Sequence, residues 1–280
     1  MGRALPVVRN VAKAWGLLVG LCAALGAFGW WLSGYRVASI FVFCGLLLGV
    51  AAYLYADRVA MGMVGARELL PGEAPGLHST VERLALRAGV VKPRLYVISD
   101  GFPRAVSAGR GATSSALAVS TGLLGLPAPA ELEGVLAHEI AHVRNRDVLV
   151  QTTAVVLAAS LVELSRIGGA LSRALLYVLG PVAASFVHLL LSPRREFDAD
   201  RLAAELCDSP HGLADALVRL EQASELVEFR ASPATEPLYT INPFIEKGLA
   251  GLFVTHPPVA ERVRRLRDLD PDWREKLRAA

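Results

Sequence analysis

Two long uncharged runs near the start of the chain limit its possible folds more than any other feature. Residues 15–32 and 37–56 carry no charged side chain over 18 and 20 residues, respectively. A helix that rises 1.5 Å per residue needs about 20 apolar residues to cross a bilayer. Because only residues 33–36 separate the runs, we expect a transmembrane helical hairpin. A secretory signal is disfavoured, since the first run is too long and no small-residue cleavage site precedes the second.

A second apolar pair follows later in the chain. Residues 148–162 form a 15-residue uncharged run, and residues 174–191 form an 18-residue run in which His188 is the only titratable group. We expect a second transmembrane or membrane-embedded hairpin here, and a buried helical hairpin in a soluble core is the alternative. The content of 53% hydrophobic residues and the mean hydropathy of +0.42 favour the membrane interpretation.

The positions of basic residues predict the orientation of the spans. Three basic residues precede the first run and two follow the second within a short distance, whereas Arg36 alone lies in the turn. Positive charges in short loops accumulate on the cytoplasmic side of a membrane. We therefore expect the chain after residue 57 to begin in the cytoplasm.

The region between the two pairs has mixed secondary structure. Residues 71–89 predict a helix, because apolar side chains recur in it at helical spacing. Residues 94–99 and 116–124 predict strands, and the Gly- and Ser-rich residues 101–115 predict a connecting loop.

The segment HEIAH, residues 138–142, lies in a helix that is otherwise rich in Ala, Val, Leu and Ile. His138 and His142 are four residues apart, so both imidazoles face one side of the helix. This is the His-Glu-x-x-His pattern, in which two histidines bind zinc and the glutamate is the general base. Histidines that only pack or cap a helix are a weaker interpretation, since the apolar neighbours offer no polar partners. We predict a zinc site with Glu139 as the base.

A catalytic zinc site needs a third protein ligand and an open position for water. In SPRREFDADRLAAEL, Glu196 and Asp200 lie four residues apart on an expected helix. Glu196 is the candidate third ligand, and Asp200 can accept the N–H of a zinc-bound histidine. An ordinary solvated charged face is the alternative for this segment. His256, in VTHPPVAERVRRL, is a candidate donor to the oxyanion of a hydrolytic reaction, or alternatively a helix cap.

Composition excludes two other classes of function. The net charge of +3 comes without any basic stretch that has interleaved aromatic residues, so we expect no nucleic-acid partner. The three cysteines, Cys22, Cys44 and Cys207, form neither a disulfide framework nor a cysteine-type zinc site.

Together these segments resemble the HtpX family of membrane-bound zinc metalloproteases, which are relatives of the CAAX prenyl proteases. The resemblance covers most of the chain: the two N-terminal spans, PRAVSAGR, ALAVSTGLL, HEIAHVRNRD, the second apolar pair, REFDAD and THPPVAERVRRL, in that order. It implies an endopeptidase with one Zn²⁺ per chain, facing the cytoplasm in a prokaryotic inner membrane and cleaving misfolded or damaged membrane proteins. It also implies roles for particular residues: His138, His142 and Glu196 as ligands, Glu139 as the base, Asp200 beside the ligands and His256 near the substrate.

The chain departs from this family in one segment. Family members tend to carry Pro-Asn-Ala-Phe-Ala before a Thr-Gly-Arg turn, whereas PRAVSAGR has Arg104 in place of the Asn and Val106 in place of the Phe. These replacements concern the substrate cleft and leave the zinc chemistry unchanged.

Residues 116–124 suggest how a substrate is held. If this strand is a sheet edge beside the HEIAH helix, an extended peptide could pair with its backbone. Ala116, Ala118 and Ser120 are then candidate substrate-binding residues. An ordinary core strand is the alternative.

The sequence thus predicts a mainly α membrane protein with four candidate transmembrane helices and a cytoplasmic zincin-type α+β catalytic domain with a small β-sheet. The expected divisions are an N-terminal transmembrane hairpin (1–57), the first part of the catalytic domain (58–147), a second hairpin (148–192) and the second part of the catalytic domain (193–280). The expected partners are polypeptide substrates, in particular unfolded membrane proteins, and the lipid bilayer. A CAAX-prenyl-type protease and a catalytically silent zinc-binding membrane scaffold are the alternative functions.

Overall fold

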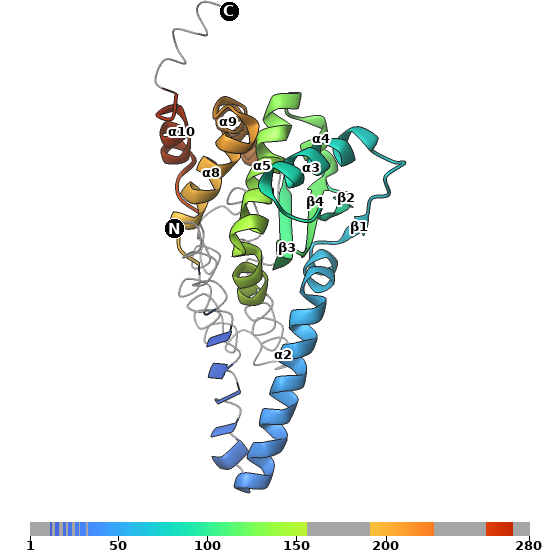
Figure 1. Ribbon diagram of the computed structural model, residues 1–280, viewed down its shortest axis with the longest axis vertical. Helices are drawn as coiled ribbons and strands as arrows, with labels where there is room; N and C mark the ends of the chain where they lie inside the picture. The colour runs from blue at the N-terminus through green and yellow to red at the C-terminus, as the bar shows by residue number, and fades with distance from the viewer. Residues whose placement is uncertain are drawn as a thin grey trace, which may run out of the picture.

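The computed structural model describes residues 34–155, 191–226 and 256–270, together with scattered positions between 12 and 33. Element labels follow Figure 1 and therefore skip some numbers. The described elements, in chain order, are α2 (Tyr35–Met63), β1 (Ala66–Glu68), α3 (Pro75–Ala88), β2 (Arg94–Ile98), β3 (Ala105–Gly111), β4 (Ser114–Ser120), α4 (Thr121–Gly125), α5 (Pro129–Asn145), α8 (Arg194–Cys207), α9 (His211–Leu226) and α10 (Val259–Arg267).

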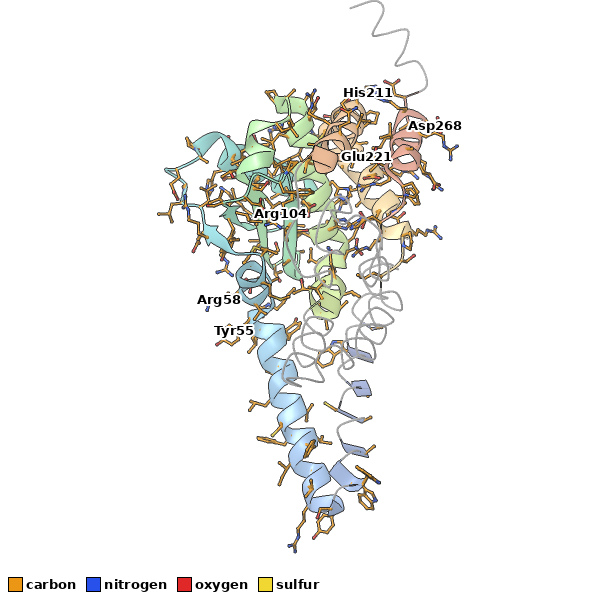
Figure 2. All side chains as sticks on the ribbon, turned by 180° about the vertical axis from the view of Figure 1, so that it is seen from behind. Tyr55, Arg58, Arg104, His211, Glu221 and Asp268 are labelled. Carbon is orange, nitrogen blue, oxygen red and sulfur yellow. The ribbon has the colours of Figure 1, made fainter. Side chains whose placement is uncertain are left out.

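The second uncharged run of the sequence is helical, as expected. It lies in α2, a helix of 29 residues that extends away from the remaining elements (Figure 1). Large apolar side chains along α2 are exposed, among them Ile40, Phe43 and Leu47. Near the end that meets the sheet, Tyr55 and Arg58 project outward (Figure 2). Across the described ranges, no helix combines the length and the apolar character that a bilayer crossing requires.

The second apolar pair lies mostly outside the described residues. Residues 147–155 form a separate helical segment after the turn at Arg146, and residues 156–190 are not described. The expected hairpin of residues 148–192 therefore stays a prediction, as does most of the first span, residues 15–32.

A small mixed sheet forms the centre of the remaining structure. Its four strands have the order β1-β2-β4-β3. The central strands β2 and β4 are parallel, and both outer strands are antiparallel to their neighbours. β3 lies within residues 101–115, which the sequence predicted to be a loop. The Gly and Ser content of that segment gives it a weak strand propensity, and pairing with β4 overrides this.

The two faces of the sheet are covered by different helices. Leu95, Ala105 and Leu117 pack into a core with α3, α5, α8 and α9. Their sequence neighbours, such as Tyr96, Val106 and Ala118, pack on the opposite face against the end of α2 and Val155. Successive residues of a strand point to opposite faces, so this alternation is what a sheet buried on both sides produces.

α5 lies between the sheet and α8 and α9 (Figure 1). Its contact with α9 is close enough to require glycine on both helices. A Cβ atom at Gly134 would lie 2.6 Å from Leu213 N, and one at Gly212 would lie 2.4 Å from Ala130 O. The HEIAH segment is therefore held on a helix with little freedom to shift.

Candidate metal centre

His138 and His142 lie on one face of α5, as their spacing predicts. Both side chains are buried, and the two Nε2 atoms are 3.1 Å apart. Because both imidazoles are buried, the two Nε2 atoms can bind a shared ion in place of solvent water. The i, i+4 geometry of the helix produces this convergence without help from other elements.

Glu196 approaches the two imidazoles from α8. Its Oε2 lies 3.5 Å from His138 Nε2 and its Oε1 lies 3.6 Å from His142 Nε2, and the carboxylate is fully buried. Donors bound tetrahedrally to zinc at its usual bond lengths are about 3.3–3.4 Å apart. The three residues are the cluster in the described part of the chain that could hold a metal ion.

The surroundings of Glu196 also fit a cation. Neither of its oxygens accepts a hydrogen bond from the described residues, although both are buried. Burial raises the pKa of this carboxyl, but nearby His256, His142 and Arg195 lower it well below its usual value. Glu196 is therefore a buried anion, which is the charge state that a metal ligand needs.

Asp200 holds the ring of His138. Its Oδ1 lies 3.0 Å from His138 Nδ1, the nitrogen that faces away from His142. Asp200 also accepts two hydrogen bonds from the fully buried Arg262, from Nε at 2.9 Å and from Nη2 at 2.7 Å. Burial raises the pKa of Asp200, but Arg262 lowers it to about 2. An ionised carboxylate at Nδ1 fixes the tautomer that leaves Nε2 free to bind a metal.

Asp147 holds the ring of His142 in the same way. The distance from its Oδ2 to His142 Nδ1 is 3.1 Å. Burial lowers the pKa of His142, but Glu196 and Asp147 together raise it to about 10. This role of Asp147 was not predicted from the sequence. The available signal was an acid that follows the end of the HEIAH helix, where Arg146 adopts a left-handed conformation with φ of 59° and turns the chain.

Glu139 is buried beside the cluster on the same helix. Its Oε2 accepts a 2.6 Å hydrogen bond from the hydroxyl of Ser107 on β3. Sequence reasoning gave no role to Ser107, because it lies in the segment that was expected to be a loop.

His256 lies in the same cluster, immediately before α10. Its Nδ1 is 3.1 Å from Glu196 Oε2, and its side chain is buried. The structure thus brings His256 together with the other predicted site residues, although they lie on three separate segments of the chain. These other residues are His138, Glu139, His142, Glu196 and Asp200.

The prediction that residues 116–124 form a sheet edge is wrong. β4 pairs with β2 on one side and with β3 on the other, so its backbone is not open to a peptide. Ala116 and Ala118 face the α2 side of the sheet, away from α5. The Ser120 hydroxyl accepts hydrogen bonds from the backbone of Arg104 and of Leu123. These three residues therefore contribute to the packing and hydrogen bonding of the sheet and do not lie at the metal centre.

The two departures from the family pattern lie apart from the cluster. Arg104 is buried within the domain (Figure 2), where its Nη2 lies 2.9 Å from Asp100 Oδ2. Val106 packs on the face of the sheet that is opposite to α5.

Comparisons with known proteins identify proteins that are similar to this chain. The family model described as peptidase family M48 matches residues 71–270. A protein named Protease HtpX homolog from Pelotomaculum thermopropionicum is 38% identical over 275 residues, covering 92% of this chain and 98% of the relative. A protein of the same name from Pyrococcus abyssi is 37% identical over 270 residues, covering 90% and 91%. The crystal structure of S. mikatae Ste24p is similar with a TM-score of 0.49 and 20% identity, covering 92% of this chain and 65% of that one.

Proposed function

The chain belongs to peptidase family M48 and is a metalloprotease, and we propose that it is a zinc endopeptidase that cleaves misfolded or damaged membrane proteins at the cytoplasmic face of a prokaryotic inner membrane. One observation carries this proposal: His138, His142 and Glu196 converge in a buried cluster that suits a metal ion, next to Glu139. The catalytic assignments follow from this arrangement.

The histidines and Glu196 would hold a single zinc ion. Zinc supplies a Lewis acid that polarises the scissile carbonyl and lowers the pKa of water to about 7. Asp200 and Asp147 keep the Nδ1–H tautomers, which direct each Nε2 at the ion. Metal binding requires both imidazoles to be neutral. With one carboxylate, the zinc centre would then keep a net positive charge, which would favour a developing oxyanion.

Glu139 is the proposed general base. It removes a proton from the attacking water and delivers it to the departing amine, so that one carboxylate serves both halves of peptide hydrolysis. Its burial limits exchange of that proton with solvent. His256, which lies at the cluster, is the proposed donor to the oxyanion.

Attachment to a bilayer is part of the proposal. The exposed apolar side chains of α2 and the uncharged runs support membrane contact by the hairpins of residues 1–57 and 148–192. The basic residues that flank the first pair favour a cytoplasmic catalytic domain, formed by residues 58–147 and 193–280.

The test is the Glu139→Gln variant of the full chain, purified in detergent with zinc. It should keep the metal, because Glu139 is not a proposed ligand, and it should lose cleavage of an unfolded substrate such as casein. Cleavage at the wild-type rate would refute the mechanism. Zinc retention in a wild-type protein that cleaves no unfolded substrate would instead favour a silent scaffold.

A further inference from the structure

A hydrogen bond from the sheet fixes the carboxylate of Glu139. Ser107 Oγ donates to Glu139 Oε2 at 2.6 Å, and both side chains are buried, at 0% and 2% exposure. Hydroxyl-to-carboxylate bonds of about 2.5–2.7 Å belong to the stronger, charge-assisted class. With Oε2 engaged in this way, the proton-accepting role falls to Oε1.

The position of Ser107 is fixed on both sides. In the β3–β4 register Ser107 lies opposite Leu117, and two residues further along Gly109 N donates to Thr152 Oγ1 at 3.2 Å. Ala105 on the same strand packs toward α5, so the alternation of side chains also directs Ser107 to that helix. The Ser107 hydroxyl is therefore positioned by β3, and the placement of β3 does not depend on Glu139.

The carboxylate needs such a restraint. The last torsion of a glutamate side chain is broad, so packing of the methylene groups alone does not fix the oxygens. The hydrogen bond from Ser107 supplies such a restraint.

We propose that Ser107 is a positioning residue for the general base, acting through Glu139 and not on the substrate or the metal. This inference rests on the proposed function, since it presupposes that Glu139 is the base. Loss of the hydroxyl removes one contact that holds the carboxylate in its reactive orientation, which slows proton transfer but leaves substrate binding unchanged.

The test is Ser107→Ala in the full-length, zinc-loaded protein, with kcat and KM measured on a fluorescent unfolded casein. Alanine removes one oxygen atom and adds no volume, so the strand should be retained. We expect kcat to fall about tenfold, which is part of the 10²–10⁴-fold that a general base contributes. KM and zinc content should stay at their wild-type values.

Ser115→Ala is the matched control. Ser115 is a buried serine on the adjacent strand β4, and its hydroxyl has no hydrogen-bond partner among the described residues. This variant removes the same atom from the same sheet, and its kcat should remain within twofold of wild type.

A second background separates positioning from a general effect on the fold. In Glu139→Asp the carboxylate is one methylene shorter and lies beyond the reach of Ser107, while a base is still present. Adding Ser107→Ala to that variant should change kcat by less than twofold. An equal tenfold loss in both backgrounds would show that Ser107 acts through the fold, and would overturn the inference.

Two further outcomes count against the inference. Either a wild-type kcat in Ser107→Ala or a loss of zinc from it refutes positioning of the base. Failure of the proposed function looks different, because Glu139→Gln would then retain activity whatever the Ser107 variants do.

Discussion

Asp200→Asn should destabilise the metal-free protein by leaving a buried cation without its main partner. Arg262 is fully buried, and both of its hydrogen bonds to Asp200 are made to a carboxylate that is itself buried. Breaking a buried ion pair by removing one partner costs about 3–5 kcal/mol. Glu196 Oε2 remains 3.8 Å from Arg262 Nη1 and compensates in part. We therefore expect the lower end of that range, about 3 kcal/mol.

The measurement is the free energy of unfolding from urea titrations in detergent, with zinc removed by a chelator so that altered metal binding does not contribute. Glu205→Gln is the control on the same helix, because Glu205 pairs with Arg201 at an exposed site, at 3.8 Å. Exposed pairs contribute about 0–1 kcal/mol. The double variant Asp200→Asn/Arg262→Met should recover at least half of the loss, since it removes the unpaired charge.

The same reasoning gives a pH dependence. Arg262 lowers the pKa of Asp200 in the folded protein to about 2, from an ordinary value of 3.8. The stabilisation of roughly 2 kcal/mol is therefore complete above pH 4 and is lost as the pH falls toward 2. Asp200→Asn should lack this acid-sensitive component. A loss below 1 kcal/mol in the single variant, or a double variant no more stable than the single one, would refute the reasoning.

Four other variants test the remaining parts of the site. Asp147→Ala should weaken zinc binding by about 10–100-fold, because the ring of His142 loses its orienting carboxylate. The affinity is measured against a competing chelator, and an unchanged affinity would contradict this role of Asp147. Metal analysis should find stoichiometric zinc in the wild type and none in His138→Ala or Glu196→Ala. Zinc retained in Glu196→Ala would remove Glu196 from the ligand set. Gly134→Ala should lower the free energy of unfolding by about 1–3 kcal/mol, because the added methyl group meets the backbone of α9. An unchanged free energy in urea titrations would show that α5 and α9 can move apart.

The part of the site that the sequence predicted is the part set by local geometry. Helical periodicity alone places His138 and His142 on one face of α5. The spacing of Glu196 and Asp200 likewise puts both carboxylates on one face of α8, so a single helix can supply a ligand and the partner of a histidine. The relative positions of the two residues in each pair therefore do not depend on the rest of the fold.

What the sequence did not predict depends on distant contacts. The order of strands in a sheet is not encoded in any one strand, so β4 was assigned an edge position that β3 occupies. Ser107 was missed for the same reason. The sequence also suggested no role for Asp147 at the metal centre, because its proximity to His142 arises only when the chain turns at Arg146.

The segments that make up the metal centre are far apart in order of synthesis. Residues 138–147 emerge from the ribosome first, residues 194–200 later, and residues 256–262 last. Arg262 and His256 are thus missing while the first histidines already exist. A nascent chain therefore has no complete metal centre until the last of these segments has been synthesised and has packed against the first two.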